Sequence, residues 1–377
     1  MTLRERVIKT FEKKKIDRIV YGPRLYYWYF VNKIYLKQRE DLQKEIPSHL
    51  LGKSQLEIYD YLKASPRYAD ETLGLPFLAI KRNPEAQIKV KMRKGSKTGE
   101  YVTIYKTPLG TLKQIQSIGG GLGGHITEFP IKSIEDIKIM KYILESTEIY
   151  FLKNNFDKAE ERFGYRCVTS NYISKSPFQI LVIEYMGFTR TILYFKRYPN
   201  QMEDFVKFLE IHDDQMYDQI AKSPLKIVNF GENIDGNLST PPFFEKYHIP
   251  YYKKRVKQLH QSGKICHIHI DGSLKDLLPY LGDLPFDGLE ALTARPQGDV
   301  SLEEIRDSIG NKVLLDGIPS ILFLPQYSNN YVSEYARKVL DLFSPNLILG
   351  VSDELSPNGD IKKIEMIGDI VRKYELN

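Results

Sequence analysis

Residues 264–272 read Lys-Ile-Cys-His-Ile-His-Ile-Asp-Gly, a short β-branched run that ends in polar residues. Side chains alternate between the two faces of a strand, so the cysteine and the last two isoleucines form one apolar face. His267, His269 and Asp271 form the opposite face. An apolar face suits packing against outer helices, whereas the polar face would point into a barrel, with His269 and Asp271 near its mouth.

Similar strand-like runs surround this segment in the second half of the chain, at Leu225–Phe230, Phe286–Leu292, Lys312–Leu315 and Leu347–Gly350. Helical periodicity separates them over Glu245–Gln261, Leu274–Leu281, Leu302–Ile309, Val332–Phe343 and Ile361–Tyr374. Strands that alternate with helices of this length predict a parallel sheet with helices outside it.

The polar residues at the strand ends favour a closed barrel over an open sheet. Almost every run ends in an acid, an amide or a histidine, namely Asn229, Glu232, His269, Asp271, Glu290, Asp316, Asp353 and Glu354. In a barrel these ends converge on one mouth, whereas in an open doubly wound sheet they would spread along an edge. We therefore expect an α/β fold of the (β/α)₈ TIM-barrel type.

The first 130 residues are irregular and rich in tyrosine. They predict helices over Leu3–Lys14 and Gln55–Lys63, and a β-hairpin that pairs Gln87–Met92 with Tyr101–Tyr105 across a polar turn. We expect a single barrel domain over residues 1–377, with residues 1–130 as an N-terminal extension packed on it.

Composition indicates a soluble, cytoplasmic protein. Apolar residues make up 42% and charged residues 27% of 377 residues, which is ordinary for a globular chain that buries a large core. Cys167 and Cys266 are the two cysteines; we expect both to be buried, and a reducing compartment fits them. No run approaches the roughly 18 apolar residues that cross a bilayer, so no membrane association is expected.

The net charge of +6 is made of interspersed residues of both signs. The local basic stretch Lys89–Lys97 fits a solvated hairpin face, or a rim that attracts an acidic partner protein. This density of basic residues does not indicate nucleic-acid binding.

One histidine and two or three carboxylates at the strand ends can form an open zinc site, because zinc accepts histidine nitrogen and carboxylate oxygen and keeps one position free in catalytic sites. His269 and Asp271 are adjacent on one face, and Glu290 and Glu354 end neighbouring strands. The alternative is a hydrogen-bonded His–Asp pair that supports the rim without metal. His267, deeper in the barrel, is expected to be a core histidine.

The chain resembles the uroporphyrinogen decarboxylase superfamily and, within it, the corrinoid-dependent methyltransferase branch. The resemblance covers nearly the whole chain and rests on the order and spacing of several motifs. They are TLRERVIKTFEKKKIDRI near the start, TPLGTL (107–112), SPFQILVIEYMG (176–187), NFGENIDG (229–236), FFEKYHIPYYKKRVKQLHQSGK (243–264), HIDG (269–272) and LILGVSDE (347–354).

This resemblance implies a (β/α)₈ barrel and a zinc site. The branch binds zinc through a His-x-Cys pair and a later cysteine, and distantly related methionine synthases add a glutamate between them. By this carry-over His269 matches the histidine, Asp271 falls at the first cysteine, Glu290 lies near the added glutamate, and Glu354 falls at the second cysteine. Both thiolate positions are thus carboxylates here.

A site of histidine and carboxylates leaves a harder, more Lewis-acidic zinc than a thiolate site does. Such a metal suits removal of a methyl group from an ether oxygen. The resemblance therefore implies O-demethylation of a methoxylated compound, with transfer of the methyl group to the cobamide of a separate corrinoid protein. In this hypothesis His269, Glu290 and Glu354 hold zinc, Asp271 is a further ligand or supports them, and Glu232 or Asn233 positions the substrate.

Other readings stay open. Uroporphyrinogen decarboxylases carry an early Arg-Gln-Ala-Gly-Arg-Tyr stretch that grips porphyrin carboxylates, and only Arg24 remains in the comparable region here. A lyase or decarboxylase that uses His269 and the carboxylates as acid and base without metal is one alternative. A barrel that only binds a ligand is another.

Three further features bear on the substrate. Residues 119–124, GGGLGG, match a dinucleotide pattern but lack the helix that such a site needs; a loop over the mouth would bring His125 to the substrate. The aromatic run 26–30 is either core packing or a wall built from Tyr26 and Trp28. Asp353 is also expected to contact the substrate, and a homodimer is among the assemblies that the sequence allows.

Overall fold

The computed structural model describes residues 1–35, 46–97, 99–118 and 124–376. The chain divides into two compact units. The barrel unit comprises residues 1–77, 153–173 and 224–377, and the hairpin unit comprises residues 78–152 and 174–223. The residues expected to form one N-terminal extension, 1–130, are therefore shared between both units.

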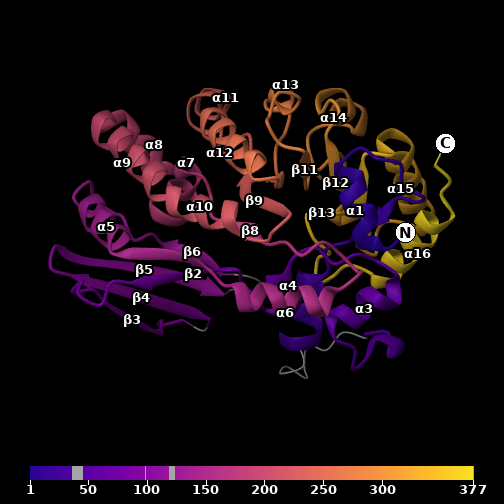
Figure 1. Ribbon diagram of the computed structural model, residues 1–377, viewed down its shortest axis with the longest axis horizontal. Helices are drawn as coiled ribbons and strands as arrows, with labels where there is room; N and C mark the ends of the chain where they lie inside the picture. Colours follow the sequence, from indigo (N-terminus) through magenta and orange to yellow (C-terminus); the bar gives the residue numbers. More distant parts are fainter. Residues whose placement is uncertain (36–45, 98, 119–123, 377) are drawn as a thin grey trace. The chain divides into compact units, whose positions relative to one another are not determined.

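A seven-stranded parallel sheet forms the centre of the barrel unit (Figure 1). Its strands, in spatial order, are β1 (Val20–Tyr21), β13 (Leu347–Ser352), β12 (Val313–Pro319), β11 (Gly288–Glu290), β10 (Ile265–Ile270), β9 (Ile227–Ile234) and β8 (Tyr172–Ile173). The expected runs therefore form strands, although β9, β12 and β13 extend beyond the predicted ends.

Residues 65–68 close this sheet into a barrel. The backbone N–H of Ser65 donates to the carbonyl oxygen of Tyr21 in β1 (2.7 Å). Tyr68 forms a parallel bridge with Ser170, just before β8. This segment thus lies between the two edge strands of the sheet, and the expected (β/α)₈ barrel is confirmed.

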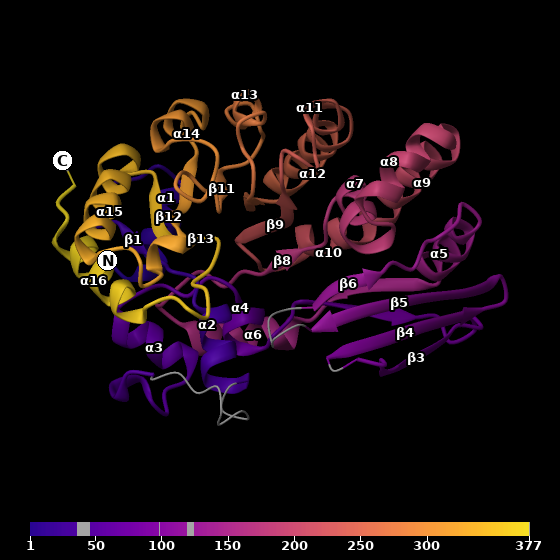
Figure 2. The same cartoon turned by 180° about the vertical axis from the view of Figure 1, so that it is seen from behind.

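Helices cover the outside of the barrel. In Figures 1 and 2, which are opposite views, α14, α15 and α16 lie on the outer side of β12 and β13. The helices that follow the later strands are α11 (Pro241–Phe243), η7 (Phe244–His248), α12 (Ile249–Gln261), α13 (Leu278–Leu281), α14 (Leu302–Ser308), η8 (Ser320–Phe323), α15 (Asn329–Phe343) and α16 (Ile361–Lys373). Those of the first half are α1 (Leu3–Phe11), α2 (Tyr26–Tyr29), η1 (Phe30–Tyr35), η4 (Ser48–Leu50), α3 (Gln55–Leu62), α4 (Ala69–Leu73) and α6 (Lys153–Phe163).

Local sequence sets several of these helix starts. Thr2, Ser54 and Ser301 precede α1, α3 and α14, and each forms a capping box with a glutamate three residues later. Helix α1 closes the N-terminal end of the barrel, because Val7 and Phe11 pack on inward-facing strand residues. The candidate functional site lies at the opposite end of the barrel, where the strands finish.

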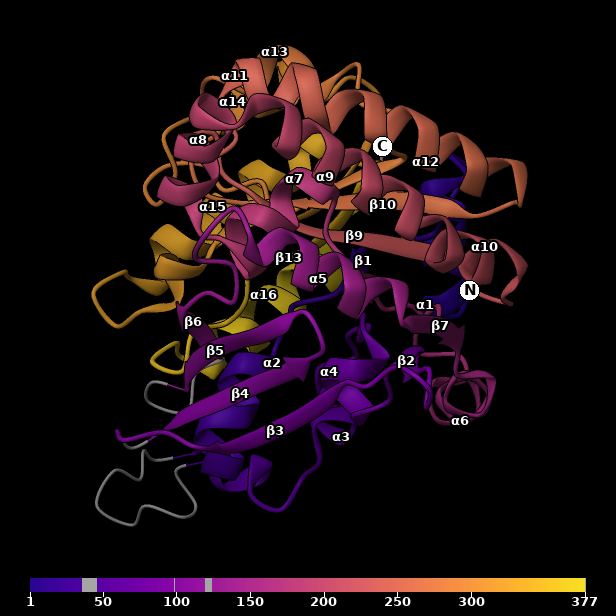
Figure 3. The ribbon, with the colours of Figure 1, turned by 90° about the vertical axis from the view of Figure 1, so that its left-hand side faces the viewer.

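The hairpin unit contains an antiparallel sheet in the order β3 (Lys89–Lys94), β4 (Glu100–Thr107), β5 (Gly110–Ile118) and β6 (Gly124–Glu128), as Figure 3 shows. The predicted hairpin is confirmed in β3 and β4. The unit also contains β2 (Leu78–Arg82), β7 (Thr147–Phe151), α5 (Asp136–Glu145), α7 (Pro177–Ile180), η6 (Leu181–Tyr185), α8 (Phe188–Arg197), α9 (Pro199–His212) and α10 (Asp214–Lys222). Among the described residues, no helix is both long and apolar enough to cross a membrane.

Candidate functional site

Glu290 ends β11 and is fully buried among polar side chains of the neighbouring strands. It pairs in register with His269 of β10. Nδ1 of His267 lies 3.1 Å from Oε2 of Glu290, and Nδ1 of His269 lies 3.6 Å from Oε1. Alternation along β10 therefore directs both imidazoles into the barrel, as the sequence predicted, and one carboxylate faces both rings.

Cationic and hydroxyl groups compensate the buried charge of Glu290. Arg67 places its guanidinium 3.1 Å from Oε1, the Tyr68 hydroxyl donates to Oε2, and Asn229 Nδ2 donates to Oε2 (2.8 Å). Burial by itself would raise the pKa of Glu290, but Arg67 and the two histidines hold that pKa well below its usual value. Glu290 is therefore a carboxylate that is already engaged by protein groups.

Arg24, which follows β1, gathers a second set of acids around a buried guanidinium. It donates to Glu71 (2.6 Å), to Glu354 (2.6 Å) and to Asp353. Burial would lower the pKa of Arg24, but these carboxylates raise it well above its usual value. The ring of Tyr172 lies under the guanidinium, 5.6 Å from its centre, and the hydroxyl of that ring accepts from it.

His269, Asp271 and Asp353 form a group that can hold a metal ion, since one ligand atom from each lies within 4.8 Å of the others. Nε2 of His269 is 3.4 Å from Oδ1 of Asp353. Burial opposes protonation of His269, yet Asp353 and Glu290 raise its pKa to about 9. Burial also raises the pKa of Asp271. This group of one histidine and two carboxylates therefore has an excess of negative charge that a cation would compensate.

A pocket of about 490 Å³ opens beside this trio at the barrel mouth. It is lined by Asp271, Gly272, Ser273, Thr293, Gln297, Gly298, Asp299 and Asp353. Asp299 accepts hydrogen bonds from the hydroxyl of Ser273 and the backbone of Leu274, so it fixes the loop after β10. The charged lining residues are all acidic, and 41% of the Asp353 side chain is exposed.

The geometry changes the expected ligand set. Glu290 and Glu354 were expected to share an ion with His269, but neither belongs to the trio. Glu290 pairs with Arg67, and Glu354 pairs with Arg24. Asp271 and Asp353 take their places beside the imidazole. Arg24 binds Asp353 as well as Glu354, but Oδ1 of Asp353 also lies 3.4 Å from Nε2 of His269. Sequence spacing reveals neither the arginine pairs nor this contact.

The other expected residues lie in different surroundings. Glu232 is buried at the end of β9, whereas the adjacent Asn233 is exposed with a positive φ of 53°. Tyr26 is half-buried, and burial together with the charges of Glu71 and Glu354 raises its pKa. Trp28 is 4% exposed, which makes it a core residue and corrects its expected role as a substrate wall.

His125 is an exposed residue of β6 in the hairpin unit. The expected lid, residues 119–124, lies outside the described residues except for Gly124. The two cysteines are buried, as predicted, and burial raises the pKa of both thiols well above its usual value.

Sequence reasoning missed Arg67, Tyr68, Glu71 and Tyr172, all of which contact the buried acids. Arg67 and Tyr68 belong to the closing segment of the barrel, whose sequence Ser-Pro-Arg-Tyr has no β-branched residue. A polar tetrapeptide of this kind gives no periodic strand signal. The one available sign was that the five predicted strands left three strands of an eight-stranded barrel to come from other parts of the chain.

Comparisons with known proteins agree with this architecture. A family model described as Uroporphyrinogen decarboxylase (URO-D) matches residues 118–374. A solved structure described as a methyltransferase from Methanosarcina mazei has 12% identity and a TM-score of 0.59, with 99% of each chain covered. A B12-independent methionine synthase from Shewanella sp. W3-18-1 has 11% identity and a TM-score of 0.39, covering 84% of this chain and 85% of that one. No curated protein matches the chain.

Proposed function

Since the chain belongs to the uroporphyrinogen decarboxylase family, we propose that it is a zinc-dependent methyltransferase that exchanges a methyl group between a small molecule and a corrinoid protein. The observation that carries this proposal is the His269, Asp271 and Asp353 trio beside the mouth pocket. A family member with an open cation site at the C-terminal ends of its strands has a ligand-accessible place for Lewis-acid chemistry.

The residues present fit zinc. One imidazole and two carboxylates supply three protein ligands and leave a fourth position open towards the pocket. Bound zinc would supply a Lewis acid that withdraws electron density from a coordinated ether oxygen. This fit rests on the excess acidic charge and on His269, which keeps its other ring nitrogen towards Glu290.

The chain's own residues prepare this site. Glu290 faces Nδ1 of His269 and can hold that nitrogen protonated, so that Nε2 presents its lone pair to the trio. Arg24 restrains Asp353 and Glu354. The 41% exposure of Asp353 places one side of the trio within reach of a ligand in the mouth pocket.

The lining of the mouth pocket indicates the substrate class. Its acids and its uncharged polar groups, Thr293 and Gln297, suit a small, polar methoxylated compound that is neutral or cationic. Of the lining residues that the structure describes, none is aromatic. In methyl transfer, the cob(I)amide of the partner would supply the electron pair of a new cobalt–carbon bond as the carbon–oxygen bond breaks. The oxygen would keep the electron pair of the broken bond and take up a proton from water, which gives the alcohol.

Porphyrin decarboxylation is disfavoured by the same charges. A polycarboxylate substrate needs free cations, but Arg24 and Arg67 are paired with buried acids. The charged residues of the mouth pocket would repel it. A non-catalytic barrel would be expected to have its mouth plugged by side chains, whereas this barrel has an open pocket of about 490 Å³ at its mouth.

Elemental analysis and a methyl-transfer assay test the proposal together. Purified protein should hold close to one equivalent of zinc, and it should methylate free cob(I)alamin from a small methoxylated alcohol, followed by the change in the corrin absorption spectrum. His269→Ala should lose both zinc and transfer while keeping its circular dichroism spectrum. Phe188→Ala, an exposed position of the hairpin unit, is the control. Methyl transfer that persists after zinc is removed would refute the metal-dependent mechanism.

A further inference from the structure

A second pocket lies in the barrel unit at the N-terminal ends of β1 and β13, opposite to the strand ends that carry the candidate site. It is formed by the segment after α1, the residue before β13 and the end of α16, and its volume is about 980 Å³. Its cationic lining residues come from two parts of the chain that are far apart in sequence. They are Lys13, Lys14, Lys15, Arg18, Arg372 and Lys373.

Most of this positive charge has no matching carboxylate. Among the residues that the structure describes, Lys15, Arg18 and Lys373 have no salt-bridge partner. Lys14 is paired with Glu12 (2.8 Å) through exposed side chains. Arg372 is half-buried, pairs with Asp369 and donates to the carbonyl oxygen of Leu62. Six cations thus face a pocket whose own acids are Asp17 and Glu375.

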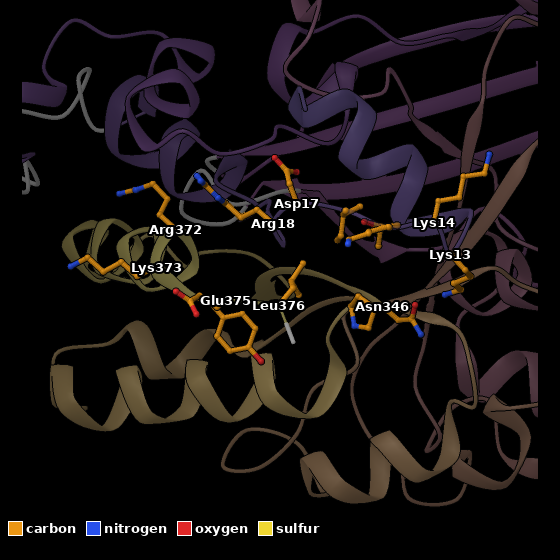
Figure 4. A pocket seen from close by; sticks show the side chains of 14 residues that line it. Lys13, Lys14, Asp17, Arg18, Asn346, Arg372, Lys373, Glu375 and Leu376 are labelled. Atoms are coloured by element: carbon orange, nitrogen blue, oxygen red, sulfur yellow. The ribbon is translucent and has the colours of Figure 1, made fainter.

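Asp17 does not neutralise the pocket, because Arg6 already binds both of its oxygens, at 2.7 and 2.9 Å. This pairing holds the pKa of Asp17 well below its usual value. Figure 4 shows Arg18 and Arg372 on one side of the pocket and Lys13 and Lys14 on the other. The cations therefore line two sides of the pocket.

We propose that this pocket is a binding site for a small molecule that carries two or more phosphate groups. Guanidinium groups match phosphate oxygens in geometry, and several lysines can reach the remaining oxygens. A volume of about 980 Å³ exceeds what a single inorganic ion fills and is that of a ligand pocket. Ile16, Pro345 and Leu376 supply an apolar surface for the rest of such a molecule.

This site is independent of the proposed methyl transfer, since none of its residues contacts the trio or the mouth pocket. A ligand bound there would join the segment after α1 to the end of α16. The expected consequence is tighter closure of the N-terminal end of the barrel, seen as a higher unfolding temperature in the presence of ligand.

Calorimetric titration of the full chain with inorganic phosphate, pyrophosphate and tripolyphosphate tests the site. Affinity should rise in that order with one equivalent bound, and it should fall as salt is added. The double variant Arg18→Gln/Lys373→Gln should weaken tripolyphosphate binding by about tenfold or more, because it removes two charge-assisted contacts. Arg18→Lys/Lys373→Arg keeps the charge and should bind within about threefold of the parent chain.

The matched control is Lys81→Gln/Arg82→Gln, which removes the same charge from exposed positions of β2. This variant should bind tripolyphosphate as the parent chain does. Equal weakening in both double variants would show attraction to net charge alone and would overturn the proposal, as would no binding of any of the three probes. Binding only of an acidic polypeptide, and not of tripolyphosphate, would also overturn it. Unfolding curves of all variants check that each is folded.

Discussion

His269 and Glu290 occupy paired positions in the register of two adjacent parallel strands, with Nδ1 of the imidazole 3.6 Å from Oε1 of the carboxylate. The other ring nitrogen faces Asp353 at 3.4 Å. Glu290 thus faces the ring nitrogen of His269 that points away from Asp353, and its charge favours a proton on that nitrogen.

Glu290→Gln should weaken zinc binding by about 10- to 100-fold, because the amide holds the imidazole less well than the carboxylate does. Competition with a zinc-sensitive dye measures this change. Glu71→Gln, which alters an acid bound to Arg24 on the other side of the site, should change zinc affinity less. Equal losses in the two variants would contradict a specific role for Glu290.

Asp353→Asn should lose bound zinc, whereas Glu354→Gln should retain most of it, because Arg24 binds both acids but only Asp353 belongs to the trio beside His269. Elemental analysis of the two proteins decides between the ligand set of the structure and the one inferred from sequence. The reverse result would restore Glu354 as the ligand.

Arg67→Met should destabilise the fold by about 3–5 kcal/mol, because it leaves the buried acids Asp316 and Glu290 without their cation. Urea unfolding measures the change. Lys153→Met, which breaks an exposed pair with Asp157, should change the stability by less than about 1 kcal/mol. Similar values for the two variants would show that the buried pair contributes no more than an exposed one.

Phe11→Ala should cost about 3–5 kcal/mol, since Phe11 is 7% exposed and fills the N-terminal end of the barrel. Met92→Ala, on the exposed strand β3, should stay within about 0.5 kcal/mol of the parent chain. Thermal or urea unfolding gives both values, and a small loss at Phe11 would show that α1 adds little to the core.

His248 should make the protein less stable in acid. Its burial lowers its pKa from 6.5 to about 3, so the unfolded chain binds a proton first as the pH falls. The stability that the neutral ring contributes is complete above pH 6.5 and declines below it by about 1.4 kcal/mol per pH unit. His248→Gln should remove this part of the slope in urea unfolding between pH 7.5 and 5. Parallel slopes for the two proteins would contradict the assignment.

The alternation of Lys264–Gly272 was enough to predict which side chains face into the barrel, and His267, His269 and Asp271 lie as that pattern requires. The strands of the second half were found for the same reason, since each is buried on both faces and reads as an apolar run. The segment 65–68 was not predicted because it has no run of apolar side chains. Its place is fixed by a hydrogen bond to Tyr21 of β1 and by a bridge to Ser170, which precedes β8.

The sequence by itself therefore determined the barrel, its helical cover and the end at which polar groups collect, because these follow from local periodicity and strand direction. The tertiary structure decided which acids lie beside His269, where a cation could bind. Arg24 and Arg67 come from the first 70 residues and reach acids more than 200 positions away. Charge pairing inside a barrel depends on distances between side chains, and no local pattern encodes those distances.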